Sequence, residues 1–408
     1  MLQRNLGAVR VAALLVSASY GVAFLLGSGE MAIHSGMAGS LYAIITALGM
    51  LALAVVAPTL WRGRELIWDV LGERHGQTVR KLVALLSLVW MAGVLAAQIH
   101  GGIAVLVAVG LPATHALAVI AAAVLVMSSI ELGMAAMLFA CSNLALAHAL
   151  AASQGLTVYL HVWPSFLQET YAAPRAETLV TIAAVGFLVI TGSDYQQFVI
   201  AARRPRDAWL GCALASLFLM VTGFLPAATV VAALHAGRLS GLTDTAGAIP
   251  WIMLQTGRSV APVCIGVILL AALGSGTAIA RAMSSALEGL HARDGRYGYA
   301  SRLLIIVIGC AIATDGQAIV STIVSLNVVY VAAVGLLFLF HESGRQVAPR
   351  CASAMLLSGT TVSLLVSAMH WTGIGHLPAW FPLPAGLFAS ACVPVALQFA
   401  PRLDRGRS

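Results

Sequence analysis

The side chains that could do chemistry in this chain gather around two polar interruptions of apolar segments. One is Ser17-Ala18-Ser19-Tyr20-Gly21 and the other is Gly192-Ser193-Asp194. A carboxylate such as Asp194 inside an apolar segment can contact a solute or carry a proton, and it needs a partner or a wet cavity because charge is costly in lipid. Alternatively, it caps the free N–H groups of the helix that follows, and the two roles can coexist.

Other polar residues on apolar segments extend this set. Glu30 and His34 are one turn apart, so they share a helix face and predict an acidic vestibule for a cationic or zwitterionic solute, or a proton relay. A solvated rim is the alternative for this pair. Arg281 could bind a carboxylate of the solute or form an inner gate with a carboxylate such as Asp194, or it could instead extend to the interface. The remaining candidate solute contacts are Gln98, Ser193, Tyr195 and Asn327.

The composition indicates a polytopic membrane protein. Of 408 residues, 60% are apolar and only 9% are charged, too few charges to solvate a soluble core of this size. A spanning helix needs roughly 20 apolar residues, and twelve segments qualify. They are 6–36, 38–61, 82–110, 114–130, 132–155, 178–202, 208–235, 259–288, 301–315, 317–341, 351–371 and 382–400.

Charge placement agrees with twelve spans. With both termini in the cytoplasm, 18 of the 22 Lys and Arg residues fall on the cytoplasmic side. Arg175, Arg238 and Arg258 fall on the other side. The net charge of +7 follows from this bias, and without long basic stretches it does not indicate nucleic-acid binding. An Arg to Lys ratio of 21 to 1 is typical of a GC-rich genome and favours a bacterial inner membrane.

Several function classes lack their motifs. No phosphate-binding G-x-x-x-x-G-K-[ST] loop is present, so we do not expect this chain to bind ATP and use it to drive a process across the membrane. The six cysteines are scattered singly and share no metal-ligand spacing. We therefore expect no enzyme activity and no cofactor or metal beyond a coupling ion, Na⁺ or H⁺. The expected partners are a small solute and the bilayer.

The order of local patterns resembles the sodium:solute symporter family, of which this chain would be a short and divergent member. The run Gly27–Gly36 is similar to the family's G-x-P-G-x-A-x-x-x-G, and Gly63–Gly76 looks like its cytoplasmic G-R loop. The strings Leu95–Ile99, Gln197–Arg203 and Ser284–Leu287 also resemble family patterns.

The resemblance implies a LeuT-type fold of the APC superfamily, an all-α protein of about 12 spans with an inverted 5+5 repeat. Its first and sixth spans would be broken, and two peripheral helices would follow. The repeats would occupy 1–155 and 178–341, followed by 342–408. Unwound helices in matching positions of two halves are typical of a substrate site near the midplane. The resemblance also places a sodium ion at the carbonyls of Ser17 and Tyr20 and at Ser275, with Thr277 as a substitute for a missing hydroxyl.

These observations predict a secondary active transporter that moves a small polar solute by alternating access, driven by a sodium or proton gradient. The alternative is a membrane sensor or partner subunit that does not transport. Its support is the incomplete hydroxyl pair around Ser275, which lies between Gly274 and Gly276.

Overall fold

The computed structural model describes residues 4–21, 23–127, 133–290, 298–314 and 319–399. Within them the chain is helical, and its one extended pairing is an isolated parallel bridge between Leu6 and Ala202. The predicted all-α class is therefore confirmed. In chain order the elements are α1 (Ala8–Ser19), η1 (Ala23–Gly27), α2 (Ser28–Ser35), η2 (Gly36–Ser40), α3 (Leu41–Gly63), α4 (Ile67–His75), α5 (Gln77–Ala108), α6 (Ala113–Met127), α7 (Gly133–Ala152), α8 (Leu156–Leu160), α9 (Val162–Ala172), α10 (Arg175–Thr191), α11 (Ser193–Ile200), α12 (Pro205–Thr222), α13 (Leu225–His235), η3 (Thr245–Gly247), α14 (Ala248–Leu254), α15 (Ala261–Leu290), α16 (Gly298–Ala313), α17 (Ile319–Glu342), α18 (Pro349–Trp371), η4 (Ile374–His376) and α19 (Pro382–Phe399).

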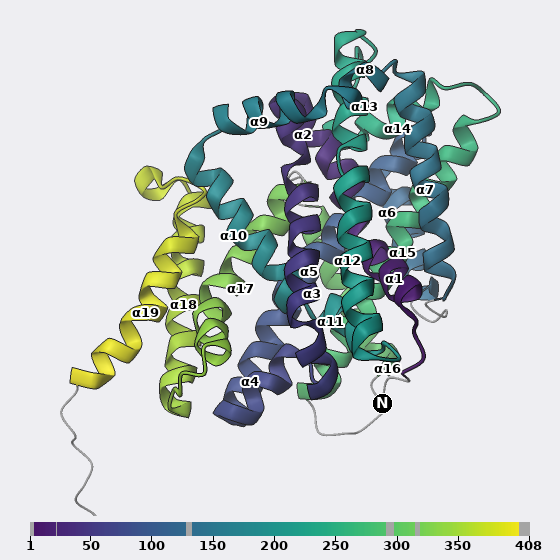
Figure 1. Ribbon diagram of the computed structural model, residues 1–408. Helices are drawn as coiled ribbons and strands as arrows, with labels where there is room; N and C mark the ends of the chain where they lie inside the picture. The colour runs from purple at the N-terminus through teal and green to yellow at the C-terminus, as the bar shows by residue number, and fades with distance from the viewer. Residues whose placement is uncertain (1–3, 22, 128–132, 291–297, 315–318, 400–408) are drawn as a thin grey trace, which may run out of the picture.

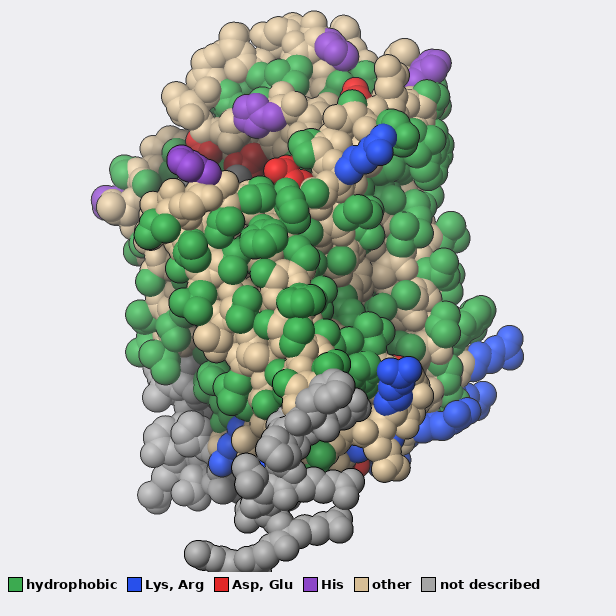
Figure 2. Space-filling view, turned by 90° about the vertical axis from the view of Figure 1, so that its left-hand side faces the viewer, with side chains coloured by type: hydrophobic (Ala, Val, Ile, Leu, Met, Phe, Trp, Pro, Cys, Tyr) green, Lys and Arg blue, Asp and Glu red, His purple; other side chains and the backbone are tan. Residues whose placement is uncertain are grey.

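The long helices are apolar enough to cross a membrane. Among the described residues seven segments qualify, and shorter apolar helices accompany them. The seven are Phe24–Gly63, Gln77–Ala108, Arg175–Ile200, Pro205–His235, Ala261–Leu287, Ile319–Glu342 and Pro349–Trp371. Figure 2 shows the matching surface on one face, a broad hydrophobic band with most Lys and Arg below it, and with acidic, histidine and further basic side chains above it. The protein is thus an integral membrane protein.

The long helices stand side by side, and short helices cover both ends of the bundle (Figure 1). We call these the α9 end, where α9 lies across the bundle, and the α4 end, where α4 and the N-terminus lie. Helices α18 and α19 form one flank and pack against α17. The predicted boundary between 114–130 and 132–155, and the tail after residue 399, lie outside the described residues.

Several predicted spans are interrupted. Segment 6–36 divides at Tyr20–Gly21 into α1 and the η1–α2 pair, and segment 178–202 divides at Gly192 into α10 and α11. A further interruption, not predicted, lies at Gly223 between α12 and α13. Continuous helices α5, α15 and α17 pack beside the broken ones, and the buried interior between these elements holds the candidate site.

The α4 end is tied together by contacts among the broken helices and their neighbours. The Trp61 indole N–H donates to the Ala202 carbonyl at 2.7 Å. The Arg4 guanidinium donates to the Trp61 carbonyl and lies 3.7 Å from the centroid of its ring. Backbone hydrogen bonds of 3.2 and 2.8 Å join Leu6 to Ala201 and Arg203. The start of α1 and the end of α11 are therefore held to each other and to α3.

Candidate functional site

The first interruption brings backbone carbonyls of α1 against α15. Helix α1 ends at Ser19, and the Ser275 hydroxyl of α15 donates to the Ala18 carbonyl at 3.1 Å. Ser17 and Ser275 are both buried. The hydroxyl of Ser275 thus lies beside the Ala18 carbonyl, next to the break. Ala18 is the neighbour of Ser17, whose carbonyl was the predicted ligand.

Gly21 allows three helices to meet at this point. A methyl group placed on Gly21 would lie 2.5 Å from Ser275 Oγ and 2.6 Å from both amide atoms of Gln98. Gln98 lies on α5 and is buried. Only a residue without a side chain fits such an approach. Gln98, Ser275 and the first break, which sequence analysis treated separately, are therefore direct neighbours.

The hydroxyls of Thr277 and Tyr20 are both engaged away from Ser275, although the ligand predicted at Tyr20 is its backbone carbonyl. The Thr277 hydroxyl donates to the Leu273 carbonyl of its own helix at 2.6 Å. The Tyr20 hydroxyl donates to the Thr222 carbonyl at 3.3 Å, and its ring lies 4.5 Å from that of Phe24. The contact that the structure shows at the first break joins the Ala18 carbonyl and the Ser275 hydroxyl, and the ion ligands at the Ser17 and Tyr20 carbonyls stay a prediction.

The second interruption is shaped by Gly192. This residue ends α10 and precedes α11 with an extended backbone, φ −66° and ψ 120°. A methyl group on Gly192 would lie 2.6 Å from Asp194 Oδ1 and 2.7 Å from the Leu188 carbonyl. The glycine therefore lets the Asp194 carboxylate fold back over the gap between the two helices.

Asp194 is buried in the first turn of α11, with 2% of its surface exposed. Its carboxylate lies close to the backbone N–H groups of Tyr195 and of its own residue, and the Tyr195 N–H donates to the Gly192 carbonyl at 3.2 Å. These donors and the positive end of the helix dipole favour a negative charge there. Atom Oδ1 has no hydrogen-bond partner, and no Lys, Arg or His within the described ranges forms an ion pair with this carboxylate. One carboxylate oxygen is therefore available to a ligand or a proton.

Gln196 spans the second interruption. Its amide N–H₂ donates to the Ile190 carbonyl at 3.0 Å, which satisfies one of the carbonyls freed at the end of α10. Its amide oxygen accepts the Ile67 backbone N–H at 3.0 Å at the start of α4. The break is thereby connected to the short helix at the α4 end, a role the sequence alone did not assign.

A polar wall from α5 and α17 faces the second interruption. The Tyr330 hydroxyl lies near the side chains of Thr191 and Ser87 but has no hydrogen-bond partner among the described residues. The Tyr330 ring lies 6.0 Å from that of Trp90. Asn327, one turn before Tyr330, is fully buried. In the described part of the chain, the Trp90 indole nitrogen and both amide atoms of Asn327 have no hydrogen-bond partner. Buried polar atoms of this kind normally have one.

The two interruptions are neighbours, because α1 packs against α11 and the side chains of Ser19 and Tyr195 interact. The Ser193 hydroxyl lies 3.6 Å from the Met91 sulfur of α5. Sequence analysis named Asp194, Ser193, Tyr195 and Asn327 but did not include Trp90. Trp90 could have been found from the sequence, because it is an aromatic residue with an N–H group in the middle of a predicted span.

Glu30 lies apart from this region, toward the α9 end. Its carboxylate accepts the Thr245 hydroxyl at 3.1 Å and the Ile319 backbone N–H at 3.0 Å, so it joins α2 to η3 and α17. Glu30 is buried whereas His34 is exposed. The histidine that interacts electrostatically with Glu30 is His100 of α5. Arg281, the other predicted gating residue, is half-buried on α15.

Comparison with known proteins defines the class of fold. No protein-family model and no curated protein sequence match the chain. Among solved structures, a Na⁺-coupled sialic acid symporter in a substrate-bound outward-open state shares 14% identity over 98% of this chain and 91% of its own, with a TM-score of 0.70. A manganese transporter variant from Eremococcus coleocola shares 14% identity over 96% and 92%, with a TM-score of 0.58.

These likenesses establish a shared fold and do not by themselves assign a substrate or an ion. Both similar proteins are membrane transporters. The chain thus has the polytopic helical fold of such transporters, with a buried polar region at two helix interruptions.

Proposed function

We propose that this protein is a secondary active transporter that moves a small polar solute across the membrane by alternating access. The observation that carries this proposal is the junction of the two helix interruptions, through Ser19 and Tyr195, beside a buried carboxylate with a free oxygen. Opened helices occur at bilayer depth only where they line a protein-enclosed cavity. Similar folds in a sodium-coupled symporter and a manganese transporter support the same class.

The solute fits the polar atoms around the second interruption. Asp194 Oδ1 and the Asn327 amide oxygen are acceptors, and the Asn327 N–H₂ and Trp90 N–H are donors. A cationic or zwitterionic solute with its own donors would satisfy the carboxylate, which would otherwise be a lone charge in a buried place. Ser193 and Tyr195 lie at the same interruption and Gln98 lies at the first one; all three are proposed contacts.

The driving ion has one candidate position at each interruption. The Ala18 carbonyl and Ser275 hydroxyl, 3.1 Å apart, are oxygen ligands of the kind a sodium ion uses. Asp194 is the candidate for a proton, because protonation removes the cost of a buried charge without a cation partner. Sodium dependence and the effect of changing Asp194 distinguish these two forms of the proposal.

Alternating access needs an element that closes one side. Glu30 connects α2 of the broken pair to η3 and to the continuous helix α17. We propose that this contact holds the α9 end closed and separates when the solute enters from that side. Glu30 is therefore proposed as a gate residue, while His34, exposed on the same helix, is proposed to lie at the rim.

The charge bias supports an orientation. Arginines are concentrated at the α4 end, so we propose that this end and both termini face the cytoplasm of a bacterial cell. We further propose that residues 1–155 and 178–341 are the two inverted repeats, because the broken helices α1–α2 and α10–α11 hold matching positions in them.

A solute screen tests the proposed function. A ligand that binds only the native state raises its apparent stability, by about 2.7 kcal/mol at a concentration 100 times its Kd. Purified protein would be heated with amino acids, betaines, polyamines and sugars, in sodium or in choline salts and at several pH values. Selective stabilisation by one cationic or zwitterionic class, followed by uptake of that solute into proteoliposomes, would support the proposal. A stabilising solute that binds but is never taken up would support the sensor alternative.

A further inference from the structure

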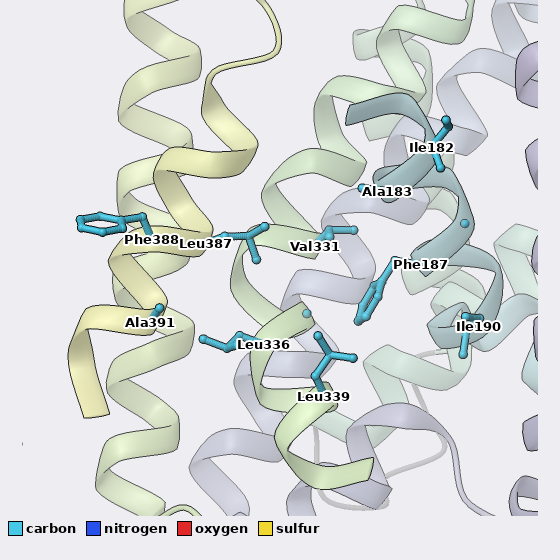
Figure 3. Close-up of a pocket in the computed structure, with 12 residues that line it drawn as sticks. Ile182, Ala183, Phe187, Ile190, Val331, Leu336, Leu339, Leu387, Phe388 and Ala391 are labelled. Atoms are coloured by element: carbon cyan, nitrogen blue, oxygen red, sulfur yellow. The ribbon is translucent and has the colours of Figure 1, made fainter. Parts of the chain in front are cut away.

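A groove of about 630 Å³ opens on the flank of the bundle between α10, α17 and α19 (Figure 3). Its lining side chains are all apolar and include Phe187, Ile190, Leu336 and Leu387. Two of its walls belong to segments long enough to cross a membrane, Arg175–Ile200 and Ile319–Glu342. In such a location the groove is in contact with hydrocarbon, so its occupant is apolar over the whole of this length.

The floor of the groove is open because two glycines face it. A methyl group on Gly186 or on Gly335 would meet its nearest neighbours at 3.6 Å, an ordinary van der Waals distance. By contrast, a methyl group on Gly359 or Gly386 would lie 2.5 or 2.7 Å from Ala332, so those glycines permit close helix packing. The glycines of the groove are not required by packing, and they leave room for a molecule that is not part of the chain.

Positive charge lies where the groove approaches the α4 end. Leu339 lines the groove, and α17 ends three residues later at Glu342. Arg345 is exposed, with its guanidinium 5.7 Å from the centroid of the Phe340 ring. The Arg74 guanidinium lies 3.4 Å from the carbonyls of His341 and Gly344.

Both arginines are exposed, although Arg74 also donates to the carbonyls of His341 and Gly344. Neither Arg74 nor Arg345 belongs to an ion pair within the described ranges. The acidic residues beside them in the sequence, Glu73 and Glu342, are exposed to solvent. A negative group at the membrane surface is attracted to juxtamembrane arginines of this kind.

We propose that the groove binds one acyl chain of an anionic phospholipid, whose phosphate lies at Arg345 and Arg74. Lipid tails are as apolar as leucine, so the apolar walls alone give little preference for one lipid over another. The shape of the groove would retain an acyl chain, and the arginines would select the lipid whose headgroup is anionic.

This lipid would lie against the helix faces opposite to those that carry the proposed solute site. Ile190 lines the groove one residue before Thr191, and Val331 lines it one residue after Tyr330. Thr191 and Tyr330 interact on the opposite, polar side. The acyl chain would therefore lie between α10, directly before its interruption, and the continuous helix α17. The binding itself does not depend on the proposed transport function.

Lipid retention measured by native mass spectrometry tests the proposal. The full-length protein would be released from nanodiscs of 1-palmitoyl-2-oleoyl-phosphatidylcholine containing a known fraction of the corresponding phosphatidylglycerol. We expect one retained phosphatidylglycerol per chain in the native protein. Gly335→Phe and Gly186→Leu, which fill the groove from opposite walls, should each reduce retention about tenfold. Arg345→Gln should lower the preference for phosphatidylglycerol about fivefold while a lipid remains bound.

The matched control is Gly266→Phe on α15, where a substituent meets nothing within 4 Å. It should retain the lipid as the native protein does, and thermal unfolding would verify that each variant folds. Equal retention by folded Gly335→Phe or Gly186→Leu would overturn the proposal, as would the absence of any headgroup preference in the native protein. A dimer that Gly335→Phe dissociates would identify a second copy of the chain as the occupant and would also overturn it.

Discussion

The Ser275 hydroxyl donates to the Ala18 carbonyl across 3.1 Å, and this contact joins the interrupted helix α1 to the continuous helix α15. Both residues are buried, and Gly21 lies close enough to Ser275 that no side chain fits between them. A carbonyl near the helix interruption therefore accepts its hydrogen bond from a neighbouring helix. The same two oxygen atoms are the proposed ligands of a sodium ion.

The first prediction concerns Ser275. Changing Ser275→Ala leaves the Ala18 carbonyl buried without this donor, so unfolding in detergent should become easier by about 1–3 kcal/mol. Any stabilisation by sodium should be lost as well. Thr277→Val is the control, because the Thr277 hydroxyl bonds only within its own helix. Retention of full sodium stabilisation by Ser275→Ala would exclude this position as the ion site.

The second prediction concerns Asp194. Asp194→Asn preserves size and should allow folding, but uptake of the solute should fall at least about tenfold, a loss of roughly 1.4 kcal/mol. If Asp194 carries the driving proton, exchange down a solute gradient should survive while uphill uptake is abolished. Asp207→Asn, at a half-exposed ion pair with Arg203, should leave both activities unchanged. Unaltered uphill uptake by Asp194→Asn would contradict the proposed role.

The third prediction compares two glycines of one segment. Gly192→Ala places a methyl group 2.6 Å from the Asp194 carboxylate and should destabilise the protein by roughly 1–3 kcal/mol. Gly186→Ala meets nothing closer than 3.6 Å and should be neutral or stabilising by up to about 1 kcal/mol, since alanine favours a helix. Equal effects of the two changes on the thermal midpoint would argue against a specialised backbone at Gly192.

The fourth prediction concerns the proposed closure of the α9 end by Glu30. Glu30→Ala removes the bonds to Thr245 and Ile319 and should expose the space beneath η3. In a background without native cysteines, a cysteine in place of buried Ala248 should then react several-fold faster with a membrane-impermeant maleimide. His34→Ala, which alters an exposed side chain, should not change the rate. A labelling rate unaffected by Glu30→Ala would mean that Glu30 is not a gate.

The fifth prediction is a pH dependence at the corner between α3 and α4. Burial and the neighbouring Glu73 and Asp69 carboxylates raise the pKa of Glu65 from 4.5 to about 7, despite the opposing effect of Arg80. Because the folded-state pKa is the higher one, Glu65 contributes stability at low pH, and this contribution is lost as the pH rises from about 4.5 to about 7. In the Glu65→Gln variant the thermal midpoint should vary less with pH across this window. An unchanged pH profile would contradict the shift.

The sequence predicted both helix interruptions because lipid makes polar runs such as Ser17–Gly21 and Gly192–Asp194 conspicuous. It also named Gln98 and Asp194, since each is a polar side chain inside an apolar segment, and the family resemblance pointed to Ser275. The helical class and the membrane location follow from composition and segment length alone, and the structure confirms both.

Contacts between helices could not be predicted from the sequence. Spacing within one helix paired Glu30 with His34, whereas the folded chain places Glu30 against Thr245 and the start of α17, near His100. The same limit applies to Gln196, whose partner Ile67 lies 129 positions away. Helix periodicity predicts which residues lie on the same face of one helix. The residues that this face contacts on other helices are known only from the packing of the folded chain.

The most direct test of the central claim is a structure determined with the stabilising solute bound. The proposal predicts the solute between the two interruptions, with a donor within hydrogen-bond distance of Asp194 and a face toward Asn327 or Gln98. Solute found only outside this region, with Asp194 still enclosed by protein and uncontacted, would contradict the transport mechanism proposed for this protein.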